Sequence, residues 1–225
     1  MDGGGDGPTR YFDSSVGLPI RQPSAARTLA SRAMFPLLSL LSREQSVRLR
    51  LVPIDDERVI MALRYARGHV LDVGCGANNF VRSYGDGVGV DVHAWEGVDQ
   101  VVENAADLPF ADDTFGTVSF LACLNHIPNR AAALGEAYRV MEPGGRLLVT
   151  MIPPGVGRFV HWLRFRNDPD HRARTIDHDH ELLGMHSTHV RSLITDAGFT
   201  GLTRRRFVYG INSIYVGRKP TAPQE

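Results

Sequence analysis

The sequence predicts an α/β protein with a doubly wound, mostly parallel sheet, and three observations support this fold class. Short apolar runs alternate with helical segments along much of the 225-residue chain, as in a parallel sheet whose strands are joined by helices. The first clear run ends in two glycines, Gly74 and Gly76, which is typical of a strand that turns tightly into a helix. A second run ends at Asp91, about 20 residues after the first, where such sheets bind polar ligands.

Seven runs are expected to form strands because each is short, apolar and bounded by turn residues. The first five should be parallel, and the last two should pair antiparallel at the sheet edge. In chain order these runs are 69–73, 87–92, 101–102, 117–121, 146–151, 203–207 and 211–216.

Helices are expected before, between and after these runs. They cover 55–66, the stretch from the glycine turn to about residue 83, 131–141 and 187–197. Pro143, Gly144 and Gly145 should end the third helix. Ser187 should cap the fourth, and Gly198 should end it.

The predicted domain organisation has three parts. Residues 1–23 are rich in glycine, proline and serine and should be a flexible N-terminus. Residues 24–66 should form a helical extension, which Pro36 divides, and which covers the sheet or lies on a membrane surface. Residues 67–225 should form the main domain, in which 153–186 break the strand–helix alternation and are expected to be a lid.

Composition narrows the function classes. Lys and Arg together number 25, as do Asp and Glu, so the strongly basic balance of many nucleic-acid-binding proteins is missing. No apolar run approaches the roughly 18 residues of a spanning helix, and the first residues lack signal-peptide features. Two cysteines cannot build a disulfide framework. We expect a soluble, cytoplasmic protein with no nucleic-acid partner and no integral membrane segment; its oligomeric state is left open.

The glycine turn predicts a site for a nucleoside-containing cofactor. Glycines let a ligand lie against the backbone, and the first N–H groups of the following helix need partners. An acid at the position of Asp91 suits a ribose diol. Asp72, beside the turn, would repel a pyrophosphate and attract an ammonium group. Asn79 also replaces the third glycine of a dinucleotide turn. The better ligand is therefore S-adenosyl-L-methionine.

Five segments in order strengthen this prediction. They are D-V-G-C-G at 72–76, G-V-D at 89–91, L-P-F-A-D-D-T-F at 108–115, L-N-H-I at 124–127 and E-A-Y-R-V-M-E-P-G-G at 136–145. Together they resemble the motifs of class I S-adenosylmethionine-dependent methyltransferases of the ubiquinone-biosynthesis-like, "methyltransferase 11" type. The resemblance covers residues 69–153 closely and implies a Rossmann-like sheet of seven strands.

The resemblance also implies the cofactor contacts. The methionine part would lie on the glycine turn with its ammonium near an acid, the ribose on the second acid, and the adenine beside an amide, a backbone N–H and an apolar side chain. The implied residues are Asp72, Gly74, Cys75, Gly76, Asp91, Asn104, Ala105, Leu108 and Leu121. The chain departs from the family pattern at three positions. Asn78 stands in place of a third glycine, and Gly116 and Asn104 each stand in place of an acidic residue. Asn tolerates left-handed backbone, so the turn can survive.

The implied activity is transfer of a methyl group to a small-molecule acceptor, with oxygen as the first acceptor atom and carbon or nitrogen after it. Two other hypotheses stay open: a non-catalytic module that binds the cofactor for a partner, and a nicotinamide-dependent oxidoreductase. His126, after the fourth strand, is the first candidate for a base. The alternative for His126 is a packed histidine that shapes the pocket.

The expected lid carries further candidates for contact with the acceptor, namely Trp162, His178 and His180. The histidines between 171 and 189 also suggest a metal site, but no compact ligand motif such as H-E-x-x-H is present. We therefore expect no metal and interpret these histidines as part of a polar lid.

Overall fold

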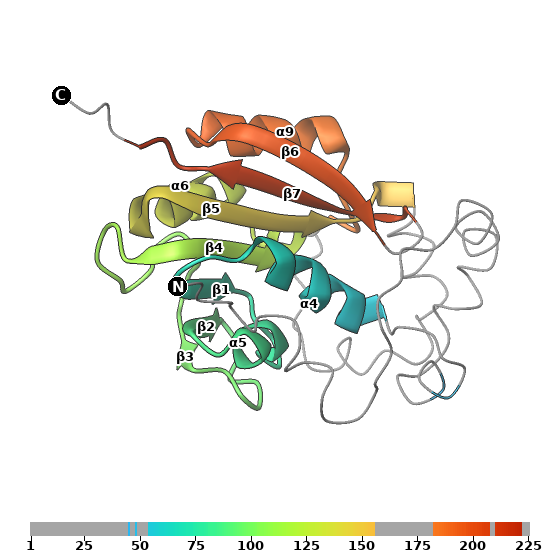
Figure 1. Ribbon diagram of the computed structural model, residues 1–225, viewed down its shortest axis with the longest axis horizontal. Helices are drawn as coiled ribbons and strands as arrows, with labels where there is room; N and C mark the ends of the chain where they lie inside the picture. The colour runs from blue at the N-terminus through green and yellow to red at the C-terminus, as the bar shows by residue number, and fades with distance from the viewer. Residues whose placement is uncertain (1–44, 46–47, 49–53, 156–181, 208–209, 222–225) are drawn as a thin grey trace, which may run out of the picture.

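A seven-stranded sheet organises the protein (Figure 1). The computed structural model describes residues 45, 48, 54–155, 182–207 and 210–221. The strands are β1 (Val70–Val73), β2 (Gly87–Asp91), β3 (Gln100–Val101), β4 (Phe115–Leu121), β5 (Met141–Met151), β6 (Thr200–Phe207) and β7 (Asn212–Arg218). The helices of the described part are α4 (Ile54–Tyr65), α5 (Asn79–Tyr84), η1 (Leu124–His126), α6 (Arg130–Val140) and α9 (Ser187–Asp196).

The strand order β3-β2-β1-β4-β5-β7-β6 confirms the predicted fold class. Strands β1 to β5 pair in parallel, and β7 pairs antiparallel with both β5 and β6. The chain moves outwards from β1 to β3 and then crosses back to β4 on the other side of β1. Parallel sheets with such a reversal leave a crevice at the carboxyl ends of the two strands where the order switches.

Two apolar layers, one on each face of the sheet, make up the core. Neighbouring residues of one strand point to opposite faces, so Leu71 packs in the layer of α6 and α9 while Val70 packs in the layer of α4 and α5. Leu147 and Leu148 divide between the two layers in the same way. All four side chains are fully buried, and each such burial contributes about 1.5–3 kcal/mol. The double cover explains why these strands are apolar throughout.

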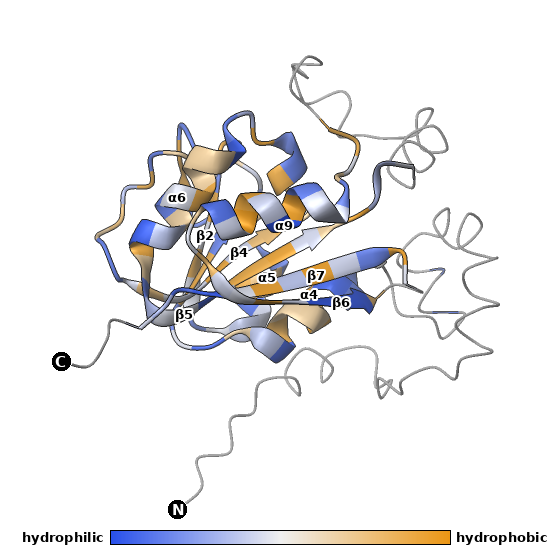
Figure 2. Ribbon diagram, turned by 90° about the horizontal axis from the view of Figure 1, so that it is seen from above, coloured by the Kyte–Doolittle hydropathy of each residue, from blue (hydrophilic) through white to orange (hydrophobic). Residues whose placement is uncertain are grey.

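The edge strand β6 contrasts with this interior. In Figure 2 it is hydrophilic over most of its length. Arg204 donates to the Ser213 hydroxyl at 3.0 Å and lies over the Tyr215 ring. Charged side chains on an edge strand discourage pairing with another chain.

Two local predictions need correction. The helix before β5 ends at Val140, ahead of the Pro-Gly-Gly turn, because Met141 is already extended (φ −84°, ψ 135°) and pairs with Phe115. The next matched pair is Thr117 with Arg146, so residues 142–145 form an irregularity within the strand. At α9 the capping position is occupied by His186, and the expected cap Ser187 is the first helical residue.

Several predictions fall outside the described residues. These are the flexible N-terminus, the helices expected before residue 51, and most of the expected lid, which includes Trp162, His178 and His180. The division into domains therefore stays a prediction. Among the residues that the structure describes, no helix is long and apolar enough to cross a membrane.

A cluster of charge-assisted hydrogen bonds joins two of the recognised segments. Arg139 donates to the carbonyl oxygens of Leu108 (3.0 Å) and Phe110 (2.8 Å) and pairs with Glu136 and Asp112. Glu136 accepts from the N–H of Leu108 at 2.9 Å. The hydrogen bond from Arg139 is the main reason why the pKa of Glu136 lies below its ordinary value. The cluster fixes the loop before β4 on helix α6.

Replacing Arg139 by Met tests this role. The variant leaves Glu136 and two loop carbonyls without their cationic donor, so we expect it to lose about 2 kcal/mol or more of unfolding free energy, measured by urea denaturation. Arg191→Met, on the exposed face of α9, is the matched control and should stay within about 0.5 kcal/mol of the wild type. Equal stability of the two variants would contradict a structural role for the cluster.

Candidate functional site

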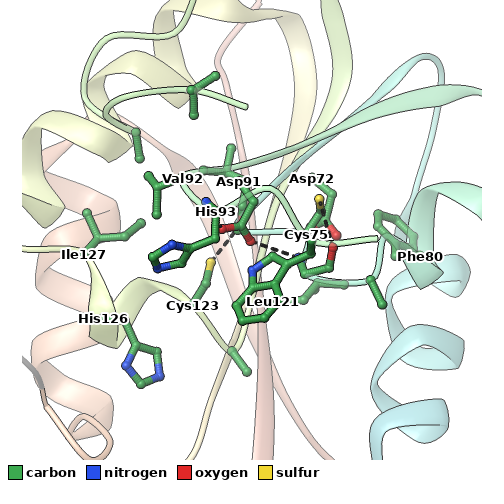
Figure 3. Close-up of a pocket in the computed structure, with 18 of the residues that line it drawn as sticks. Asp72, Cys75, Phe80, Asp91, Val92, His93, Leu121, Cys123, His126 and Ile127 are labelled. Atoms are coloured by element: carbon green, nitrogen blue, oxygen red, sulfur yellow. Dashed lines mark hydrogen bonds between the residues drawn. The ribbon is translucent and has the colours of Figure 1, made fainter. Parts of the chain in front are cut away.

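A pocket of about 1260 Å³ opens at the carboxyl ends of β1, β2 and β4. Figure 3 shows Asp72, Cys75 and Phe80 on one side of the hollow and His126 and Ile127 on the other. Its walls come from α4, the glycine turn, the loop after β2, residues 102–105 and the segment after β4. The pocket therefore occupies the switch point where the strand order reverses.

The two glycines of the turn are needed for different reasons. Gly74 (φ +71°) lies against Cys123, and an added Cβ would stand 2.6 Å from the Cβ of that residue. Gly76 (φ +53°) lines the pocket, and an added Cβ would meet nothing within 4 Å. Gly74 thus closes the turn against the protein, whereas Gly76 leaves a bare backbone surface against which a ligand can lie.

Asp91 ends β2 at the edge of this surface. Its Oδ2 accepts from the N–H of Gly76 at 3.0 Å, and its Oδ1 accepts from the N–H of His93 at 3.0 Å. These bonds hold the carboxylate in a fixed orientation, and each oxygen keeps a lone pair for a further donor. Asp91, the residue predicted to bind a ribose, is therefore held in a fixed orientation in the pocket lining.

Asp72 lies deeper, with 2% of its surface exposed. Burial is the main effect on its carboxyl group and raises its pKa to about 7. The hydrogen bond that Ser119 Oγ donates at 2.6 Å and the nearby Arg58 lower the pKa, while Asp91 raises it. A carboxyl group with so high a pKa gains from a bound cation, which favours its ionised form.

The left-handed position of the turn is filled by Asn78 (φ 58°), as the sequence predicted. Its side chain is buried, and Nδ2 donates to the carbonyl of Gly97 (3.0 Å) and to Asp99 (2.7 Å). Asp99 also accepts from the N–H of Gly89 at 2.8 Å. An asparagine in place of glycine thus ties the turn to β2 and the loop after it. Asp99 belongs to no recognised segment, so no sequence pattern pointed to it.

Of the residues expected at the adenine, two line the pocket and one does not. Asn104 and Ala105 line the pocket, as does Leu121. Oδ1 of Asn104 accepts from the N–H of Ala106 at 2.9 Å, which leaves it one lone pair for a ligand. Leu108 is absent from the lining and is 2% exposed within the core. Its backbone is held by Glu136 and Arg139, and its expected contact with adenine stays a prediction.

His126 lies in η1 after β4, lines the pocket and is exposed. Its Nε2 lies 2.9 Å from Nδ2 of Asn125, which also donates to the carbonyl of Leu182 at 2.8 Å. Because an amide nitrogen donates, Nε2 accepts and the ring proton is placed on Nδ1. The neighbouring amide thus sets the orientation of the ring.

Other groups at the site have limited chemistry. Burial raises the pKa of the Cys75 thiol to about 12 and that of Cys123 well above its ordinary value, so neither is a ready nucleophile. No group of three metal-ligating side chains occurs within the described ranges.

Sequence reasoning did not assign Arg58, His93 or Trp95, which also line the pocket. The rings of His93 and Trp95 meet edge to face at 5.6 Å. Their position just after Asp91, at the end of a parallel strand, is the signal that could have identified these two. Arg58 lies before the first recognised segment and gave no such signal.

The residues present fit an adenosylated amino acid. The backbone at Gly76 is open, and the carboxylate of Asp91 is oriented at the end of β2, where a ribose is expected. The amide of Asn104, expected at the adenine, lines the same pocket. The buried Asp72 supplies the acid that an ammonium group requires.

Comparisons with known proteins agree with this geometry. Residues 71–149 match a family model described as "Methyltransferase domain". The "Ubiquinone/menaquinone biosynthesis C-methyltransferase UbiE" of Desulfotalea psychrophila is 30% identical over 138 residues, which are 56% of this chain and 56% of that protein. The "Demethylmenaquinone methyltransferase" of Paenarthrobacter aurescens is 26% identical over 221 residues, which are 83% of this chain and 81% of that protein. In the first of these alignments the chain spans little more than half of its relative's length.

A solved structure agrees at the level of the fold. A crystal structure from Thermotoga maritima, described as that of a SAM-dependent methyltransferase, superimposes with a TM-score of 0.55 and 16% identity. The superposition covers 86% of this chain and 97% of the other.

Replacing Asp72 by Asn should change the pH dependence of stability. The pKa of Asp72 lies near 7 in the folded protein, against 3.8 for an unperturbed group. The folded state therefore binds this proton more tightly, and its stability falls as pH rises from about 4 to about 7. Asparagine does not ionise, so relative to the wild type the ligand-free variant should gain stability between pH 5 and pH 8. Melting temperatures at the two pH values, with the exposed Asp107→Asn as control, measure the gain. If the difference in melting temperature between Asp72→Asn and the wild type were the same at pH 5 and at pH 8, the prediction would be contradicted.

Replacing Asn78 by Gly tests the buried amide network. Glycine keeps the left-handed backbone but loses both hydrogen bonds of Nδ2, so we expect a loss of about 1–3 kcal/mol in urea unfolding. Asn78→Ala should lose roughly 1 kcal/mol more, because alanine is strained at this φ. A glycine variant as stable as the wild type would show that the network contributes nothing.

Proposed function

We propose that this chain is a class I S-adenosylmethionine-dependent methyltransferase, which transfers a methyl group from S-adenosylmethionine to a small-molecule acceptor. The observation that carries the proposal is the contact between Gly76 and Asp91. It joins an open backbone surface, against which a ligand can lie, to a carboxylate that can accept from ribose hydroxyls. A carboxylate without such a surface beside it would be weaker support for a site that binds an adenosyl group.

We assign the cofactor to this pocket through the chain's own donors and acceptors. Asp91 would accept from the ribose hydroxyls, and Asp72 would face the amino group. The bare backbone at Gly74, Cys75 and Gly76 would support the amino acid part. Asn104 and Ala105 would contact the adenine, and Leu121 would pack beside it. Leu108 has no part in this assignment.

The protein's contribution to the reaction is mainly positional. The bound cofactor supplies a methyl group on a sulfonium, which is a good leaving group, so the pocket has to align an acceptor with it and exclude water. An acceptor hydroxyl must lose its proton, and His126 is the candidate base because it is exposed on the pocket wall. To take that proton at Nε2, His126 must give up the hydrogen bond from Asn125.

A hydroxyl oxygen is our first candidate for the acceptor atom. A ring carbon of a quinol is the second, because the relative from Desulfotalea psychrophila is named a C-methyltransferase of ubiquinone and menaquinone biosynthesis. Both candidates need a deprotonated hydroxyl, so both can use the same base. Trp162, His178 and His180 stay proposed acceptor contacts.

Calorimetric titration with S-adenosylhomocysteine tests the cofactor assignment. We expect micromolar binding, no binding of NADH, and at least about tenfold weaker binding by Asp91→Ala. Failure of the wild type to bind S-adenosylhomocysteine would contradict the proposed function.

Turnover separates an enzyme from a module that only binds the cofactor. Phenols and demethylated quinols are incubated with the protein and cofactor, and mass spectrometry identifies methylated products and the atom that carries the methyl group. His126→Gln should lower kcat by roughly 100-fold or more if the ring is the base. An unchanged kcat in that variant would exclude His126 as the base, and binding without any turnover would favour the non-catalytic alternative.

A further inference from the structure

Arg58 brings a cation into the pocket lining from outside the recognised segments. It belongs to α4 and lines the pocket together with its neighbour Val59 and with Asp72. Helix α4 packs against α5, the helix that follows the glycine turn, and the two lie on the same face of the sheet in Figure 1. This packing places a side chain from residue 58 beside a turn that is formed by residues 74–76.

Arg58 lines the same pocket as the carboxyl group of Asp72. Its positive charge lowers the pKa of that carboxyl group, in opposition to the effect of burial. The other arginine in the lining is Arg82, which lies elsewhere: its guanidinium carbon would be 2.7 Å from a Cβ added at Gly97, in the loop after β2. Arg58 is therefore the arginine on the Asp72 side of the pocket.

The amino acid part of the cofactor needs such a cation. It carries an ammonium group and a carboxylate on the same carbon atom. Asp72 and Asp91 would attract the ammonium group and repel the carboxylate, because both are acids in a partly dry site. A guanidinium group offers two parallel N–H donors that match a carboxylate.

We propose that Arg58 binds the carboxylate of the cofactor's amino acid part, so that Arg58 and Asp72 together recognise its two opposite charges. This inference rests on the proposed function and extends it to a residue outside the matched methyltransferase segment. It also gives α4 a role in cofactor binding in addition to its role in the core.

The test compares two ligands that differ only in the carboxylate. S-adenosylhomocysteine carries it, and the decarboxylated analogue of S-adenosylhomocysteine keeps the amino group but lacks it. Arg58→Gln should bind S-adenosylhomocysteine at least about tenfold more weakly than the wild type. The same variant should bind the decarboxylated analogue as well as the wild type does, and Arg58→Lys should recover part of the loss.

Arg64→Gln is the matched control, because Arg64 lies on the same helix, is exposed and is absent from the pocket lining. It should bind both ligands like the wild type. Circular dichroism and melting temperature establish that each variant is folded before titration.

The outcomes separate this inference from the proposed function. If the wild type binds S-adenosylhomocysteine and Arg58→Gln binds it equally well, the carboxylate contact is overturned and the cofactor assignment stands. Equal weakening for both ligands would also overturn the contact, because it would mean that Arg58 acts on the shape of the pocket. If the wild type binds neither ligand, both proposals fail.

Discussion

The site depends on one carbonyl oxygen, that of Val90. The N–H groups of Gly74 and Cys75 both donate to it, at 2.8 and 3.0 Å, which bends the chain after β1 towards the end of β2. That bend brings the N–H of Gly76 to Asp91 and starts α5 at the point where its first turn faces the pocket. Backbone amides and a single carbonyl thus set the relative positions of the turn and the acid. The side chains around them tune a geometry that the backbone has already fixed.

Asp72 illustrates a conflict between stability and binding. A buried carboxyl group with a raised pKa destabilises the folded protein at neutral pH, because its ionised form has left water without full compensation. The hydrogen bond from Ser119 and the charge of Arg58 compensate in part. Such an arrangement is typical of a binding group that gains most of its partners when a ligand arrives.

The sequence predicted the features that follow from local chemistry. Strands β1, β2, β4 and β5 were visible as apolar runs, because a strand covered on both faces needs apolar residues throughout. The glycine turn and the left-handed Asn78 were visible because few residues adopt positive φ. The recognised family motifs implied a Rossmann-like sheet of seven strands and eight of the residues that line the pocket.

What the sequence missed depends on contacts between distant segments. Leu108 was expected at the adenine because it stands in a recognised motif, yet Glu136 and Arg139 draw its backbone onto α6, 28 and 31 residues further along the chain. Arg58 lines the pocket from α4, and Asp99 holds Asn78 from the loop after β2, yet neither residue lies in a recognised motif. The irregularity at 142–145 depends on the pairing of Met141 with Phe115, which local propensity does not encode.

The stem of the segment between β5 and α9 has an evolutionary consequence. The chain leaves the sheet near Ile152 and returns at Leu182 and Met185, where Met185 donates to the carbonyl of Ile152 and Leu182 pairs with Asn125. The two ends are therefore held together by hydrogen bonds among described residues. By loop-closure entropy, doubling the length of chain between two fixed anchors costs only about 0.6 kcal/mol. Insertions and deletions between these anchors therefore need not disturb the turn, the acids or the core.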